Sequence, residues 1–256
     1  MRLYLALFFA LVAWGQPQAS NFQPGWPCTS KSPAFDPSYG KLAESTGGHL
    51  FLFDKSEVAA FSSIAIGDMQ HTQTIARVLG RSESFQDLKF PVDPSIESIF
   101  IVAWIECLQT VQLYGPDGRL VIGDQSKDQI FHGGRIATIS HPQAGNWVLR
   151  VAGSGAYSIA IEARTERQMK RIHVKNEADG KTTMSLWLDP TVNAPALTAL
   201  RADGGEAQPV SLIADPDVPR HFSATFVPAF HEFRIMVNAA DGFQRVDPRL
   251  FTAASE

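Results

Sequence analysis

The sequence contains little cysteine, little charge and no apolar run long enough for a membrane helix. Among its 256 residues there are 2 cysteines, and 19% of the residues are charged, with a formal net charge of −4. Because no basic stripe is present, a nucleic-acid partner has no electrostatic support. The apolar run near the N-terminus is too short to cross a bilayer, which takes ~20 residues. The apolar content of 45% is normal for a globular core.

Motifs that carry chemistry are also missing. Neither Gly-x-Ser-x-Gly nor His-Glu-x-x-His occurs. The histidines are scattered, and a metal pair of His221 and His231 would need a hairpin between them, so exposed loop histidines are the preferred interpretation. Residues 124–128 offer aspartates, but Lys127 opposes calcium, which takes about six or more oxygens. We therefore predict no catalytic residue, no metal ligand, no cofactor and no enzyme activity.

The N-terminus has the pattern of a secretory signal. Arg2 supplies the positive charge, residues 3–13 form the apolar segment, and Ala13 and Gly15 are small residues at the positions that a signal peptidase reads. We expect a signal peptide at residues 1–15, cleaved before Gln16, with an uncleaved membrane anchor as the alternative. The predicted location is secreted, which means extracellular, or periplasmic in a bacterium. Residues 16–38 are rich in Pro and Ser and predict a linker.

The two cysteines are Cys28 and Cys107. In an oxidising compartment they are the candidates for one disulfide. Cys107 ends an apolar strand-like segment, so a buried free thiol is the alternative. The sequence leaves both alternatives open.

Short apolar segments separated by turn residues fill the middle of the chain. Such spacing predicts an antiparallel β-sandwich. A second group of strand-like segments follows a charged break at residues 163–168, with turns at 176–180 and 203–205. The expected strands of the first group are 98–106, 110–114, 120–122, 135–139, 147–151 and 157–163, with turns at 115–118, 141–146 and 153–155; those of the second are 168–175, 182–188, 197–201, 210–213, 222–227 and 232–237.

Before these strands lies a short segment with mixed character. Residues 39–45 predict a helix that a Gly-Gly pair ends, residues 49–53 a strand, and residues 57–69 a second helix. The segment 39–51 has the sequence Tyr-Gly-Lys-Leu-Ala-Glu-Ser-Thr-Gly-Gly-His-Leu-Phe. Its order of helix, Gly-Gly turn and strand resembles the end of a von Willebrand factor A domain. The Asp-x-Ser-x-Ser metal loop of that family does not occur in the chain, so its metal-dependent adhesion does not carry over.

The resemblance continues into the strands. The segments at 90–96, 111–118, 144–149 and 155–159 are similar to the galactose-binding-like module that follows the A domain in hemicentins and related extracellular proteins. Residues 241–246 resemble the edge of an immunoglobulin-like module in the same proteins. The resemblance implies a mostly β chain: an A-domain remnant at 39–70, a galactose-binding-like sandwich at 71–165 and an immunoglobulin-like sandwich at 168–253.

Four aromatic residues bear on function. Trp104 and Trp147 lie inside strand-like segments and predict core positions, whereas Trp26 and Tyr39 could be exposed. Exposed aromatics at a sandwich rim stack on sugars in some proteins, but more often pack a loop onto the core. We expect Trp147 to face inward, because Arg150 belongs to the opposite face of the same strand.

The function expected from these features is a secreted, non-catalytic binding or adhesion module. Its partner would be an extracellular protein or glycan. The alternative is a structural accessory protein that docks on a partner chain through its incomplete N-terminal α/β segment, since an unpaired strand edge must be covered or recruits a partner.

Overall fold

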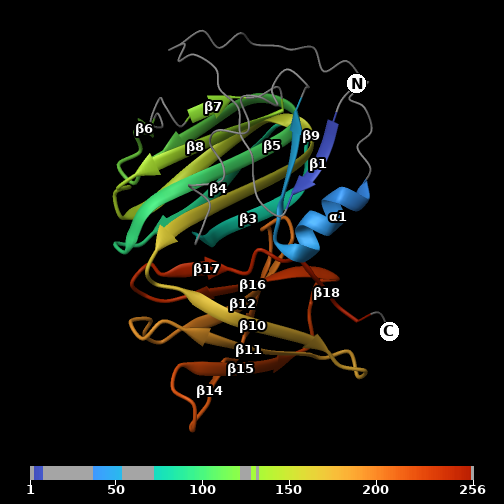
Figure 1. Cartoon of the computed structure of the whole chain (residues 1–256), viewed down its shortest axis with the longest axis vertical. Coiled ribbons are helices and arrows are strands. Elements are labelled where there is room, and N and C mark those ends of the chain that lie inside the picture. The colour runs from blue at the N-terminus through green and yellow to red at the C-terminus, as the bar shows by residue number, and fades with distance from the viewer. Residues whose placement is uncertain (1–2, 8–36, 54–71, 122–127, 131–132, 255–256) are drawn as a thin grey trace.

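The computed structural model describes residues 3–7, 37–53, 72–121, 128–130 and 133–254. The described chain is mostly β, as predicted, with antiparallel sheets and one short helix. Two β-sandwiches lie one above the other in Figure 1, and the chain passes from the first to the second between residues 165 and 169. Each sandwich has its own apolar core.

The N-terminal sandwich is built from one seven-stranded antiparallel sheet. The strand order is β3-β9-β5-β8-β7, while β4 pairs with β9 and β6 pairs with β5. Its strands are β3 (Thr72–Ser82), β4 (Phe85–Val92), β5 (Ile96–Tyr114), β6 (Leu120–Val121), β7 (Asp128–Ile130), β8 (Gly134–Ser140) and β9 (Gly145–Thr165).

This sheet forms two layers because its two longest strands bend together. β5 and β9 pair along their whole lengths, and the register shifts between Ile105 and Cys107 and again between Leu108 and Thr110. Bulges of this kind bend a strand and increase its twist. β3 pairs with the second half of β9, and β4 pairs with the first half. The apolar side chains of both halves therefore meet in one core.

The expected turn at residues 153–155 is wrong: these residues lie inside β9. A Cβ atom on Gly153 would lie 2.4 Å from the carbonyl oxygen of Cys107, and Gly155 has a φ of +96°. Glycine is needed at both positions, in one case for close approach to β5 and in the other for backbone conformation. The same sequence that is typical of a turn therefore forms the bend of a continuous strand.

The C-terminal sandwich consists of a four-stranded sheet, β10-β11-β15-β14, and a five-stranded sheet, β13-β12-β16-β17, in which β18 also pairs with β16. The expected turns at 176–180 and 203–205 are present, with positive φ at Gly180 and Gly204. The strands are β10 (Met169–Asn176), β11 (Thr182–Leu188), β12 (Ala196–Arg201), β13 (Ala207–Val210), β14 (Ile213–Ala214), β15 (His221–Phe226), β16 (Glu232–Asn238), β17 (Gln244–Val246) and β18 (Phe251–Thr252).

The N-terminal segment contributes helix α1 (Pro37–Thr46) and strands β1 (Leu3–Leu7) and β2 (His49–Phe53). The helix and the strand at 49–53 agree with the sequence prediction, and Gly47 ends the helix with a φ of +76°. The helix predicted at 57–69 lies outside the described residues. β1 pairs antiparallel with β2. None of the helices in the described ranges is long and apolar enough to cross a membrane.

Candidate functional site

Among the described residues, the candidates that the sequence offered do not form a metal or catalytic cluster. In the part of the chain that the structure describes, no group of three or more His, Cys, Asp or Glu side chains could hold a metal ion. His231 is exposed, and the Nδ1 atom of His221 lies 2.8 Å from Asp215 Oδ2 instead. In the segment 124–128, only Asp128 is described, and the Arg135 guanidinium binds its carboxylate through Nε at 2.8 Å and Nη2 at 2.5 Å.

Cys107 is half-buried near the bend of β5 and is disulfide-bonded, which removes the alternative of a free thiol. Cys28 lies outside the described residues, so the pairing of Cys28 with Cys107 stays a prediction. Tyr39 is 39% exposed on α1, whereas Trp104 and Trp147 are buried, as expected for core residues. Trp26 is not among the described residues.

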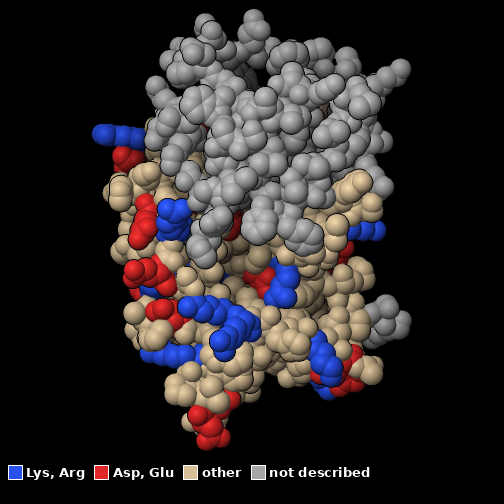
Figure 2. Space-filling view, in the orientation of Figure 1, with Lys and Arg blue, Asp and Glu red and all other residues tan. Residues whose placement is uncertain are grey.

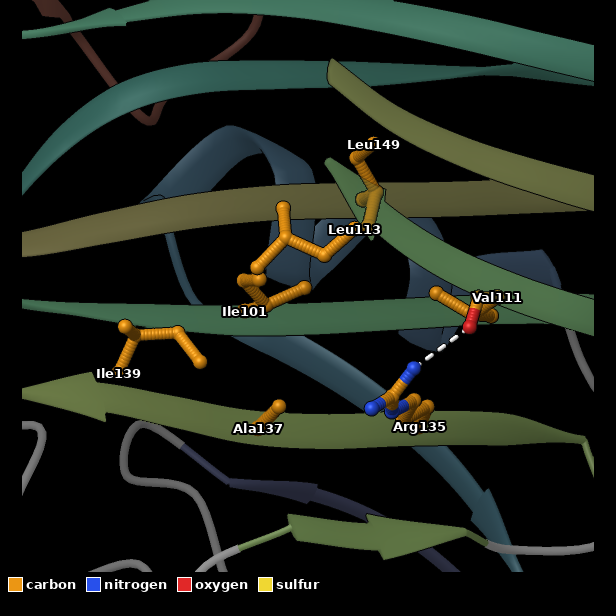
Figure 3. A pocket seen from close by; sticks show the side chains of 7 residues that line it. All are labelled: Ile101, Val111, Leu113, Arg135, Ala137, Ile139 and Leu149. Carbon is orange, nitrogen blue, oxygen red and sulfur yellow. Dashed lines mark hydrogen bonds between the residues drawn. The ribbon is translucent and has the colours of Figure 1, made fainter. Parts of the chain in front are cut away.

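A hollow of about 210 Å³, open solvent space included, lies between the two layers of the N-terminal sandwich (Figure 3). Its lining is apolar except for Arg135. The Arg135 guanidinium is already bound to Asp128 and donates to the carbonyl oxygen of Val111 at 2.5 Å. A binding pocket needs polar groups that can orient a ligand, and this hollow offers none that is uncommitted among its lining residues. It is lined by Ile101, Val111, Leu113, Arg135, Ala137, Ile139 and Leu149.

Buried charges join the helix to both sandwiches. Glu44 on α1 accepts a hydrogen bond from Arg77 of β3 at 3.0 Å and another from Arg234 of β16. The two arginine side chains are 1% and 0% exposed. Burial opposes ionisation of Glu44, but the charges of the two arginines hold its pKa below the ordinary value. This carboxylate therefore remains charged and links elements that are far apart in the sequence.

Two further groups lie beside this cluster. Burial, followed by the charges of Arg77 and Arg234, lowers the pKa of His49 to about 3. Its Nε2 atom lies 3.6 Å from Glu162, whose pKa burial raises above the usual range. Thr74 donates a hydrogen bond to the Glu162 carboxyl group at 2.9 Å. His49 is thus neutral at physiological pH, and the cluster has the character of a structural joint.

A second buried pair strengthens the same joint. Arg245 of β17 donates to Asp93 Oδ2 at 2.9 Å, and both side chains are 0% exposed. Arg245 also donates to Thr165 Oγ1 at 3.2 Å and to the carbonyl oxygen of Arg167 at 3.1 Å. These bonds cross from the C-terminal to the N-terminal sandwich at the point where the chain passes between them. They fix the relative placement of the two sandwiches.

The outward face of the sheet β10-β11-β15-β14 has a different character. Cross-strand partners place Lys170, Trp187 and His221 in one row. The Trp187 and His221 rings are 4.1 Å apart at their centroids. The hydrogen bond between His221 and Asp215 is the largest of the effects that lower the pKa of Asp215 below its ordinary value. The neighbouring outward rows of β10, β11 and β15 are hydroxyl-bearing or basic: His173, Ser185 and Ser223 in one row, Lys175, Thr183 and Thr225 in the next. On the edge strand β14, the exposed apolar residue Ile213 pairs with Ser223.

Trp187 was missed in the sequence analysis although its strand was predicted. Met184, Leu186 and Leu188 are buried and alternate with half-buried Ser185 and Trp187. Because alternate residues of a strand face opposite sides, the pattern already assigns the indole to the outward face. A large aromatic side chain among outward Ser and Thr residues was the available signal. This face is the candidate functional site.

Comparison with known proteins gives no family. No family model and no curated protein matches the chain. Similar solved structures include a lipase of Bacillus licheniformis in its propeptide form (12% identity, TM-score 0.29, 69% of this chain) and a DUF4785 family protein of Legionella pneumophila (9%, 0.35, 72%). A β-glucuronidase of Faecalibacterium prausnitzii has 11% identity, a TM-score of 0.23 and 96% coverage. The chain spans 43%, 65% and 46% of those chains, respectively, and similarity this weak carries no functional argument.

Proposed function

We propose that this chain is a secreted, non-catalytic binding or adhesion module. The observation that carries the proposal is the outward face of the sheet β10-β11-β15-β14, where polar side chains surround the indole of Trp187. A tryptophan combines a large apolar surface with a polar N–H group and is enriched where proteins bind partners. The proposal includes a galactose-binding-like fold for the first sandwich and an immunoglobulin-like fold for the second.

The arrangement of the rows supports a preorganised site. Residues on paired strands have fixed spacing, so the hydroxyl and basic groups of this face lose little freedom when a ligand binds. The ion pairs of Glu44 and Asp93 hold the two sandwiches in one orientation. A ligand on the C-terminal sandwich would therefore be presented at a constant position relative to the N-terminal sandwich.

The proposal is tested by binding of the purified chain, as a monomer, to arrays of extracellular glycans and matrix proteins. We expect Trp187→Ala to abolish retention of the ligand without loss of the fold. Tyr39→Ala is the matched control, because Tyr39 is an exposed aromatic residue on another element. Equal retention by the parent and Trp187→Ala would place binding elsewhere, and absence of any retention would contradict the proposed function.

The alternative is a structural accessory protein that docks through its N-terminal α/β segment. One observation favours it: the only described strand that pairs with β2 is β1, whose residues lie within the predicted signal peptide. Removal of residues 1–15 would free the main-chain groups of β2, and free strand edges accept partner strands. This alternative predicts that the chain lacking residues 1–15 is isolated with a second protein, whereas the binding module is isolated alone.

A further inference from the structure

Building on the proposed binding function, we infer that the ligand is an acidic polysaccharide lying across β10 and β11 of the C-terminal sandwich. The inference rests on three features of that face: an indole with a basic side chain over it, a group of exposed cations that form no ion pair among the described residues, and rows of hydroxyl groups. Together they match the apolar ring faces, the anionic groups and the hydroxyl groups of such a polymer.

The aromatic feature is Trp187 and its surroundings. The His221 ring stacks against the indole, and Asp215 holds His221 in place through Nδ1 at 2.8 Å. The guanidinium carbon of Arg171 lies 5.9 Å from the indole ring centroid. A sugar ring that packs on the indole would thus bring a carboxylate or sulfate group within reach of a guanidinium, which binds such anions with paired N–H groups.

The cations belong to β10, which is an edge strand of its sheet. Lys170, Arg171 and His173 are exposed and make no ion pair among the described residues, whereas Lys175 binds Glu177 at 2.6 Å. The charge of Lys170 also acts on the carboxylate of Asp189. Figure 2 shows Lys and Arg side chains gathered over the middle of the C-terminal sandwich, where Figure 1 places β10. The chain as a whole carries a net charge of −4. The positive charge is therefore local, and it selects for an anionic partner at this face.

The backbone at Arg171 supports a functional role for this strand. Arg171 is a non-glycine residue with a φ of 51°, and the pairing of β10 with β11 shifts register between Lys170 and His173. A residue in this conformation costs free energy, and a bulge re-aims the side chains around it. Here Lys170 lies in the outward row of Trp187, and the bulge places the next basic side chain, Arg171, over the indole ring.

The hydroxyl groups complete the face. Ser185 is paired with Ser223, and Thr183 with Thr225, on neighbouring strands. Strands in a sheet lie ~4.8 Å apart, so these pairs place hydroxyl groups close together. Thr183 Oγ1 already donates to Glu177 Oε1 at 3.0 Å, and its oxygen remains able to accept. Hydroxyl groups both donate and accept hydrogen bonds, as the hydroxyl groups of a sugar chain require.

The test is calorimetric titration of the full chain with polygalacturonate, which carries carboxylates, with heparin, which carries sulfates as well, and with dextran, which is neutral. We expect binding to one or both acidic polymers, none to dextran, and weakening as salt rises, because exposed charges are screened. Trp187→Ala and the double variant Lys170→Ala/Arg171→Ala should each raise Kd by roughly tenfold or more. The control variant Arg81→Ala/Lys89→Ala removes two exposed cations from the N-terminal sandwich and should leave Kd unchanged.

The outcomes separate this inference from the proposed function. Binding to dextran or to neutral glycans through Trp187 would overturn the acidic ligand and leave the binding module intact. If the control variant weakened binding to the acidic polymers as strongly as Lys170→Ala/Arg171→Ala does, the location of the site on β10 and β11 would be overturned. Failure to bind any polysaccharide, with retention of a matrix protein that Trp187→Ala abolishes, would overturn the ligand class alone. Melting curves of each variant show whether a loss of binding reflects a loss of folding.

Discussion

Replacement of Glu44 by glutamine removes the carboxylate that forms ion pairs with both Arg77 and Arg234. Glutamine has nearly the same shape, so the packing of α1 is preserved while the charge is lost. The two guanidinium groups would then be buried close together without their shared carboxylate. Arg77 would keep hydrogen bonds to the carbonyl oxygens of Gly47, at 3.2 Å, and Gly48, at 2.6 Å, which do not neutralise it.

The size of the effect follows from burial. Removing one partner of a buried ion pair costs ~3–5 kcal/mol, because the remaining charge is left uncompensated. The Glu44 side chain is 14% exposed, and the charge of Asp247 continues to favour ionised Arg234, so we expect the lower end, about 3 kcal/mol of the free energy of unfolding. For a chain of this size, each kcal/mol lowers Tm by roughly 2–4 °C, which gives a decrease of about 6–12 °C.

Thermal denaturation followed by circular dichroism, with scanning calorimetry to test for a single transition, measures this change. The control is Glu206→Gln, which removes a carboxylate from an ion pair with Arg201 whose two side chains are 61% and 40% exposed. Exposed pairs contribute little, so this variant should melt like the parent. If Glu44→Gln lowered Tm by less than about 2 °C, the buried arginines would have another source of compensation, and the argument would be refuted.

Three further predictions concern packing, protonation and the junction. Trp147→Ala should cost ~3–5 kcal/mol of stability, because the indole is buried and donates to the carbonyl oxygen of Gln143 at 2.8 Å; an unchanged melt would contradict this placement. Folding lowers the pKa of His49 from 6.5 to about 3, so the contribution of neutral His49 to the free energy of unfolding should be fully present above pH 6.5 and decrease towards pH 3, by at most ~1.4 kcal/mol per pH unit. Urea denaturation at several pH values should show a weaker dependence of the free energy of unfolding on pH in His49→Gln than in the parent. Limited trypsin digestion should cut first in the connection between β9 and β10, at residues 166–168, and leave a C-terminal piece that melts cooperatively, whereas uniform resistance would indicate one continuous unfolding unit.

Local patterns predicted most of the strands and their faces. Alternation assigned Trp147, Leu149 and Val151 to the core, and the three are 3%, 0% and 1% exposed. The helix at 37–46 and its termination at Gly47 also follow from neighbouring residues alone. These features could be read from the sequence because the burial of one strand face and the conformational freedom of glycine act over a few residues.

Features that depend on distant residues could not be predicted in this way. Residues 153–155 have the composition of a turn, and only pairing with β5 makes them part of one strand of 21 residues. Arg77, Arg234 and Arg245 are among the largest fully buried side chains, yet arginine in an isolated strand pattern indicates an outward position. Glu44, which compensates two of them, is 33 residues from Arg77 and 190 from Arg234.

The buried arginines assign one of the two sheets of the C-terminal sandwich to the joint with the N-terminal part of the chain. Arg234 and Arg245 both belong to the sheet that contains β16 and β17, and their partners, Glu44 and Asp93, belong to the N-terminal part of the chain. Apolar contacts alone would allow the two sandwiches to shift relative to each other. Charged hydrogen bonds are directional, so they fix one relative position, at the cost of desolvating the charges. That sheet is committed to the joint, whereas Trp187 lies on the outward face of the opposite sheet, which is the face of the proposed binding site.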